Sequence, residues 1–137
     1  YGFTVQSIGV TNASEVGTAA VSLCQQGVDC INNFTDNLVV ENLPAVLLAA
    51  EEAGIPVFGS EVEQVINGCL ATQGIDYVAL GKVAGLMAAS ILDGTSDPAT
   101  TPVSLVSEVT PAYNSEVLAT LGLTLPQDYQ DAQDVCA

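Results

Sequence analysis

The sequence predicts an α/β domain with a mainly parallel, doubly wound sheet of five strands. Five short apolar runs alternate with stretches of helical periodicity, at a spacing of about 25 residues. The length, 137 residues, is typical of one domain and is enough for a sizeable core. Hydrophobic residues make up 49% of the chain and the mean hydropathy is +0.44, so the chain is expected to fold despite its acidity.

The charge balance excludes several classes of function. There are 16 Asp and Glu residues against a single Lys, with no Arg and no His, which gives a formal net charge of -15. Binding of nucleic acid or phosphate groups depends on Lys and Arg, so no nucleic-acid partner is expected. Without His there is no imidazole base and no Ser-His-Asp or Cys-His pair. We therefore expect a protein without catalytic residues or a cofactor, and without a metal bound by His.

The first half of the chain contains two strand–helix units. A β-rich run over residues 3–10 leads through a polar turn to a helix over 16–24, whose apolar residues recur at i, i+3, i+4, i+7 and i+8. Gly27 ends this helix, a second strand follows over 28–34, and a second helix extends over 39–50. Pro44 lies inside the second helix and predicts a kink or a restart near Asn42.

Three further strands complete the pattern. The remaining predicted strands are residues 55–58, 69–75 and 103–109. The remaining predicted helices are a short one ending near residue 66, a clear amphipathic one over 80–92 and a last one over 115–121. This order predicts a Rossmann-like or flavodoxin-like, three-layer domain over residues 1–137 with right-handed crossovers, followed from 125 onward by an acidic tail.

The spacing of the four cysteines excludes a zinc ribbon and a thioredoxin-type motif. Cys24, Cys30, Cys69 and Cys136 form no Cys-x-x-Cys pair. We expect free, mostly buried thiols, because Cys packs as a small hydrophobe. Disulfides in an exported protein are the alternative, and the sequence does not choose their partners.

Polar residues follow the predicted strands where ligands bind in open α/β sheets, at the carboxyl ends. These strand ends carry Thr11-Asn12, Thr35-Asp36-Asn37, Ser60-Glu61 and Asp76. Each residue could simply cap a helix. Together they exceed what capping needs, because one side chain per helix is enough. The set therefore predicts a binding rim.

The chemistry of this rim suits a zwitterion. Glu61 and Asp76 could receive an ammonium group, whereas Asn12, Thr35 and Asn37 could hold a carboxylate or hydroxyl. A carboxylate-only Mg²⁺ or Ca²⁺ site is the alternative. It is less favoured, because the first strand does not end in an acidic pair.

Five motifs resemble one protein family, in the right order and over nearly the whole chain. They are residues 10–16 (VTNASEV), 34–40 (FTDNLVV), 53–61 (AGIPVFGSE), 67–77 (NGCLATQGIDY) with Leu80-Gly81, and 121–126 (LGLTLP). They resemble ABC-transporter substrate-binding proteins of the tryptophan/tyrosine-type uptake family. The resemblance implies a type I periplasmic-binding-protein fold, in which two Rossmann-like lobes clamp a ligand by hinge closure. It also implies that this chain is the C-terminal lobe, about half of such a protein.

The resemblance implies a function and a set of binding residues. The function is capture of a small amino acid, with aromatic and branched ones as candidates, or of a similar zwitterion, by the non-enzymatic substrate-binding component of an ABC importer. The location is outside the cytoplasmic membrane, periplasmic or lipid-anchored, and the partner is a membrane permease. The resemblance places ligand-binding roles on Asn12, Thr35, Asp36, Asn37, Glu61 and Asp76.

Two alternatives from other classes remain at this point. One is the effector-binding domain of a transcriptional regulator or sensor with the same fold. The other is an α/β enzyme domain, which would have to use carboxylates alone. The sequence also leaves two arrangements open for residues 103–137, which either stay with this lobe or cross back to a missing one. In the second case the isolated chain would expose apolar surface and self-associate.

Overall fold

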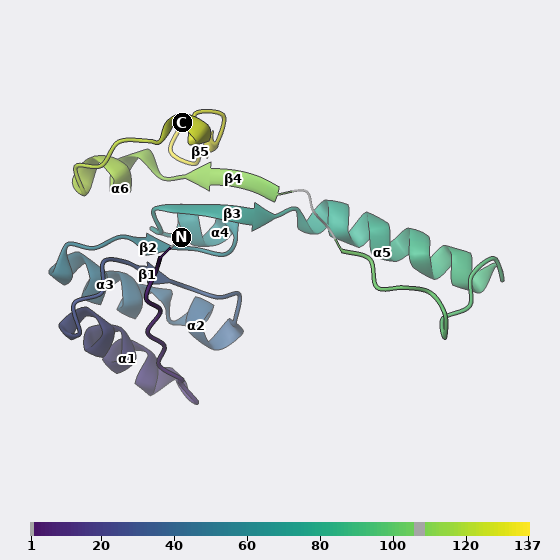
Figure 1. The fold of residues 1–137 in the computed structure, drawn as a ribbon, viewed down its shortest axis with the longest axis horizontal. Coiled ribbons are helices and arrows are strands. Elements are labelled where there is room, and N and C mark those ends of the chain that lie inside the picture. The colour runs from purple at the N-terminus through teal and green to yellow at the C-terminus, as the bar shows by residue number, and fades with distance from the viewer. Residues whose placement is uncertain (1, 106–108) are drawn as a thin grey trace.

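The computed structural model describes residues 2–105 and 109–137. Its strands are β1 (Ile31–Asn32), β2 (Val57–Phe58), β3 (Ala71–Ile75), β4 (Val109–Tyr113) and β5 (Gln133–Asp134). Its helices are α1 (Ala13–Gln25), α2 (Asn37–Glu41), α3 (Leu43–Ala53), α4 (Val62–Ile66), α5 (Tyr77–Leu92) and α6 (Ser115–Thr120), with a 3-10 turn, η1 (Gln127–Tyr129). Figure 1 shows strands stacked beside helices in the body, with α5 extending away from it.

The five strands form one sheet in the order β1-β2-β3-β4-β5. The pairs β1–β2, β2–β3 and β4–β5 are parallel, whereas β3 and β4 are antiparallel over their full length, from Ile75↔Val109 to Ala71↔Tyr113. The predicted α/β class and mainly parallel five-stranded sheet are therefore confirmed.

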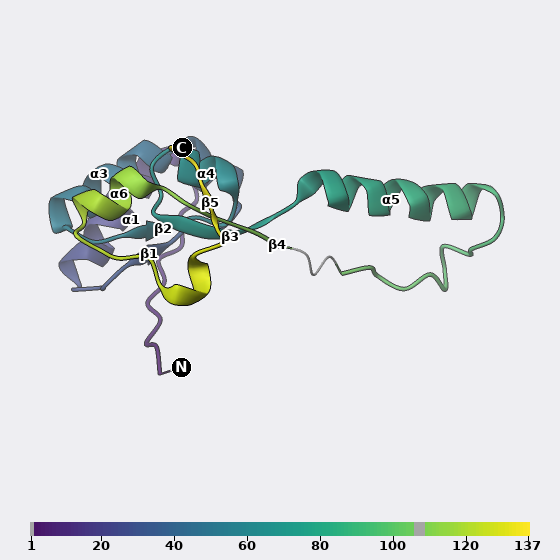
Figure 2. The same ribbon diagram turned by 90° about the horizontal axis from the view of Figure 1, so that it is seen from above.

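The core lies between α1, α3 and the parallel strands. Its most buried members are small and branched apolar side chains: Val16, Ala20, Ile31, Leu43, Val46, Ala49, Ala50, Val57, Val65 and Cys69. Seen from above, α3 and α4 lie on one side of the strands and the turn around η1 lies on the other (Figure 2). The helices therefore cover one face of the sheet more fully than the other.

The second predicted helix restarts at Pro44, as expected. Helix α2 ends at Glu41 and α3 begins at Leu43, with Pro44 in the first turn of α3, where no backbone N–H is needed. Gly54 ends α3 in the left-handed conformation, at φ 69°.

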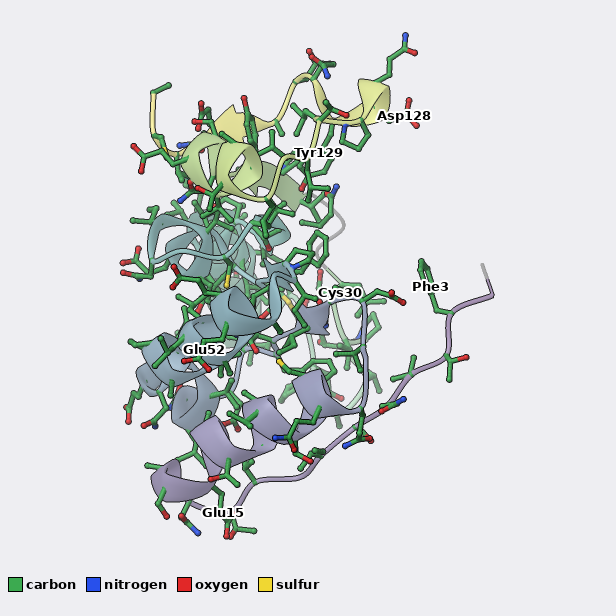
Figure 3. The ribbon with its side chains drawn as sticks, turned by 90° about the vertical axis from the view of Figure 1, so that its left-hand side faces the viewer. Phe3, Glu15, Cys30, Glu52, Asp128 and Tyr129 are labelled. Atoms are coloured by element: carbon green, nitrogen blue, oxygen red, sulfur yellow. The ribbon has the colours of Figure 1, made fainter. Side chains whose placement is uncertain are left out.

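The prediction of a strand over residues 3–10 is wrong for the described part of the chain. Residues 2–9 are exposed and form no strand, and Phe3 is 86% exposed. Figure 3 shows Phe3 standing away from the body on the N-terminal segment. Its expected neighbours, β1 and β2, pair with each other, and the segment pairs with none of the five described strands. An apolar run without a ladder partner does not become a strand.

The prediction of a strand over 103–109 is misplaced. Residues 103–105 form no strand, residues 106–108 lie outside the described residues, and β4 begins only at Val109. Pairing with β3 sets the position of β4, which includes Pro111 opposite Gln73, a residue type that usually disfavours a strand interior.

Helix α5 confirms the predicted amphipathic helix but has no buried residue. Its apolar positions Val83, Met87 and Ile91 are only half-buried, and Leu86 and Leu92 are 72% and 88% exposed. Both views show α5 and the segment after it projecting from the body (Figures 1 and 2). Among the described residues, no helix combines the length and the apolarity needed to cross a bilayer.

All four cysteines are described and are free thiols. Cys69 is buried, Cys24 is half-buried with its Sγ 3.5 Å from the Ala49 carbonyl oxygen, and Cys30 and Cys136 are exposed. The expectation of free thiols is therefore confirmed, and the expectation that most are buried is wrong.

Candidate functional site

The predicted rim residues that follow β1, β2 and β3 lie at one edge of the sheet, whereas Asn12 precedes α1 and follows no described strand. Because β1, β2 and β3 are parallel, their carboxyl ends share an edge, and the helices that follow them begin there. In Figure 1 this edge faces right, where β3 points and α5 begins. Asn12, Asp36, Glu61 and Asp76 occupy the N-cap positions of α1, α2, α4 and α5.

Two of the three predicted carboxylates cap their own helices. Asp36 Oδ1 accepts hydrogen bonds from the backbone N–H of Leu38 (2.9 Å) and Val39 (3.3 Å). Asp76 Oδ1 accepts from the backbone N–H of Val78 (2.8 Å) and Ala79 (2.9 Å). Helix capping therefore accounts for the position of both side chains.

Glu61 differs from the two aspartates. It is the N-cap of α4, but its side chain makes no capping hydrogen bond and is half-buried. Its carboxylate is thus not used by the helix that it precedes.

The amide at the start of α1 is held in a local network. Asn12 Oδ1 accepts from Ser14 Oγ at 2.5 Å, and its Nδ2 donates to Thr11 Oγ1 at 3.4 Å. Glu15 reaches back to accept from the Thr11 backbone N–H at 2.7 Å. This hydrogen bond and one from the Thr11 hydroxyl lower the pKa of Glu15. Asn37, the first residue of α2, is exposed.

The structure joins the ends of β1 and β2 through hydroxyl groups. Thr35 Oγ1 donates to Ser60 Oγ at 2.9 Å, and Gln64 Nε2 donates to the same Ser60 oxygen at 3.3 Å. Ser60 was recognised in the sequence only as part of a polar strand end, and Gln64 was missed. The available signal was a glutamine inside the short apolar helix α4, next to Val65.

A groove of about 750 Å³ opens on the sheet face beside this pair. Apolar side chains line most of it: Phe34, Phe58, Leu70, Tyr113, Leu118 and Leu125. Of the six predicted site residues only Thr35 lines the groove, together with Ser60.

Tyr129 closes one side of the groove. Its hydroxyl donates to the Thr72 carbonyl oxygen, and burial raises its pKa. Figure 3 shows Tyr129 in the C-terminal segment, turned toward the strands.

The site contains hydrogen-bond acceptors and donors. Among residues 2–105 and 109–137, no three His, Cys, Asp or Glu side chains come together in a way that could hold a metal ion. The arrangement of polar side chains and helix N-termini at the carboxyl ends of parallel strands is typical of α/β lobes that bind ligands.

Comparison with known proteins names the family. The model of the family described as "ABC transporter substrate binding protein" matches residues 1–134. This chain therefore belongs to the ABC transporter substrate-binding protein family.

Relatives agree with this assignment. The chain is 36% identical over 121 residues to a tyrosine-binding protein of Clostridioides difficile (strain R20291), covering 88% of this chain and 34% of that protein. It is similar to the ABC domain in complex with L-Trp from Streptococcus pneumonia, with 28% identity and a TM-score of 0.84, covering 96% of this chain and 44% of that one.

A third comparison concerns the ligand-free, open structure of a substrate-binding protein with adhesive properties from Clostridium difficile. The identity is 35% and the TM-score 0.72, over 98% of this chain and 44% of that one. The chain thus spans between a third and a half of the length of these relatives.

Proposed function

We propose that this chain is one lobe of the substrate-binding component of an ABC importer, and that the whole protein captures an amino acid at the polar edge of the sheet. The observation that supports it most is the placement of Glu61 and the Thr35–Ser60 pair at the carboxyl ends of β1 and β2. Family membership and the relatives named for tyrosine and L-Trp support the same conclusion.

The chemistry of the proposed site matches the two charges of an amino acid. The Glu61 carboxylate, which caps no helix, is the partner for the ammonium group. Hydroxyl and amide groups at the neighbouring strand ends are the donors for the ligand carboxylate. The protein binds without breaking a bond, outside the cytoplasmic membrane, and passes its ligand to a membrane permease.

The rest of the protein supplies the opposite wall of the cleft. Strands β4 and β5 belong to the sheet described above, whereas α5 has no buried residue and projects from the body. We therefore assign α5 and residues 93–105, rather than all of 103–137, to the contact with the other lobe. Hinge closure between the two lobes would complete the ligand site.

Calorimetry on the full-length protein tests the proposal. Titration with L-tryptophan, L-tyrosine and a branched amino acid is expected to give saturable binding of at least one of them, with a matching rise in the melting temperature. Absence of binding and of a thermal shift with every common amino acid would contradict it. The regulator alternative predicts a DNA-binding segment in the same polypeptide, which the complete gene sequence would reveal.

A further inference from the structure

Ser60 is held from two sides. It comes two residues after β2, and its Oγ accepts one hydrogen bond from Thr35 Oγ1 (2.9 Å) and another from Gln64 Nε2 (3.3 Å). A serine hydroxyl has two acceptor lone pairs and one proton. Gln64 Nε2 can only donate to Ser60, and when Thr35 donates as well, both lone pairs are occupied and the hydroxyl proton of Ser60 is left for a third group.

Gln64 is an unusual residue to place beneath this loop. It is 1% exposed, the largest polar side chain in the interior of the described chain, and its Oε1 has no hydrogen-bond partner there. Burying an incompletely bonded amide is unfavourable. Packing alone would favour an apolar side chain at this position, so the contact of Gln64 with Ser60 needs another explanation.

The backbone makes room for this glutamine. At Gly59, a Cβ atom would lie 2.9 Å from the Cβ of Gln64 and 3.3 Å from its Oε1. At Gly74 on β3, a Cβ atom would lie 3.1 Å from Val62 Cγ2 at the start of α4. Two glycines thus let α4 approach the sheet closely enough for Gln64 to reach Ser60.

We propose that Ser60 donates a hydrogen bond to the carboxylate of the bound amino acid, and that Gln64 is the positioning residue that fixes Ser60 as a donor. The inference rests on the proposed function and adds a role for two residues. Because both lone pairs of Ser60 are occupied, it cannot also accept from the ligand ammonium group, so the carboxylate is the group it recognises. Hydrogen bonds to a charged acceptor are the stronger kind.

A double-mutant cycle on the full-length protein tests this, with L-tryptophan and L-tyrosine as probes. Ser60→Ala is expected to lower the affinity about tenfold, as the loss of a hydrogen bond to a charged group does. Ser60→Thr, which keeps the hydroxyl, is expected to retain it. Gln64→Met is expected to lower the affinity by a smaller factor in the wild-type background and by none in the Ser60→Ala background, because it acts through Ser60.

A matched pair elsewhere in the chain provides the control. Gln26 Nε2 donates to Ser22 Oγ at 3.3 Å with the same sequence spacing, but at the far end of α1. Ser22→Ala and Gln26→Met are expected to leave the affinity unchanged. Melting temperatures of all variants separate loss of folding from loss of binding.

The outcomes are distinguishable. A wild-type protein that binds neither probe overturns the proposed function and this inference with it. A wild-type protein that binds, with Ser60→Ala binding equally well, overturns the inference alone. Equal losses from Gln64→Met in both backgrounds would show that Gln64 does not act through Ser60 and would overturn its positioning role.

Discussion

At the residue scale, hydrogen bonding separates the three carboxylates of the predicted rim. Asp36 and Asp76 each accept two backbone N–H groups from the helix that they cap, whereas Glu61 accepts none from α4. A carboxylate engaged by its own helix still carries charge, but its orientation is fixed by capping. Glu61 is therefore the side chain best placed to orient toward a ligand.

Under the proposed function, Glu61→Gln is expected to lower the affinity of the full-length protein for an amino acid about tenfold, because it removes the charge that we propose binds the ammonium group. Calorimetry measures the change. Glu63→Gln is the matched control, since Glu63 lies two residues further along and is exposed. If the wild type and Glu61→Gln bound the amino acid with equal affinity, Glu61 would not be the partner of the ammonium group.

The cysteines give a prediction that depends on pH. Burial raises the pKa of Cys69 from its ordinary value of 9.0 to about 12. The folded state therefore holds this proton more tightly than the unfolded state, and the associated stability is complete below pH 9 and is lost as the pH rises toward 12. The free energy of unfolding is expected to fall over this range, and less steeply in Cys69→Ala. If the free energy of unfolding of the wild type and of Cys69→Ala fell equally with rising pH, the effect would not come from Cys69.

At the element scale, local patterns predicted the helices and three of the five strands, since the predicted runs 28–34, 55–58 and 69–75 contain β1, β2 and β3. Helices α1, α3 and α5 follow from apolar spacing and from Pro44 and the capping residues, all of which are local signals. Strands depend on a partner elsewhere in the chain. Residues 3–10 have the composition of a strand but no partner, whereas β4 contains Pro111 and forms because β3 lies beside it.

Close packing of α4 on the sheet gives an element-scale prediction. Gly59→Ala is expected to destabilise the chain by about 1–3 kcal/mol, because its Cβ would lie 2.9 Å from Gln64 Cβ. Gly81→Ala in α5 is the control. Its Cβ would meet no neighbour within 4 Å, and alanine favours a helix over glycine. Thermal unfolding is expected to show a lower melting temperature for Gly59→Ala only; the same decrease in both variants would contradict the packing explanation.

The candidate site was partly predictable, because local sequence signals mark where helices begin. Asp36, Glu61 and Asp76 stand where a strand ends and a helix begins, and sequence locates that point, whereas Asn12 begins a helix that no described strand precedes. Gln64 was missed, because a glutamine in a helix normally faces solvent and its place in the apolar sequence of α4 was the only local signal. Its burial depends on the glycine at position 59, which lies on a different element.

At the scale of the whole molecule, strong acidity coexists with exposed apolar surface. The chain carries a formal charge of -15, yet Leu86, Leu92, Val103 and Leu105 are each more than 70% exposed. Exposed apolar groups that gather on one projecting segment mark an interaction surface. This surface is consistent with our proposal that α5 contacts the other lobe.

The isolated 137-residue chain is expected to self-associate through this segment. Light scattering should show a mass that rises with concentration and falls at low salt, where repulsion between acidic molecules is screened less. Leu86→Lys is expected to reduce the association. Leu48→Lys, at a position on α3 that is 59% exposed, is expected to reduce it less. A monomer at every concentration would contradict this role for α5.

The pairing of Ile75 with Val109 has a consequence for protein engineering. The chain leaves the sheet after Ile75 and returns at Val109, which pairs with Ile75. Residues 76–108 are therefore equivalent to an insertion between the two strands of a β-hairpin. Replacing residues 76–108 by an Asn-Gly turn would join β3 directly to β4 with the register unchanged. Such a shortened chain would keep Thr35, Ser60 and Glu61 and lose the projecting helix. It would offer a minimal scaffold on which one wall of the cleft could be redesigned alone.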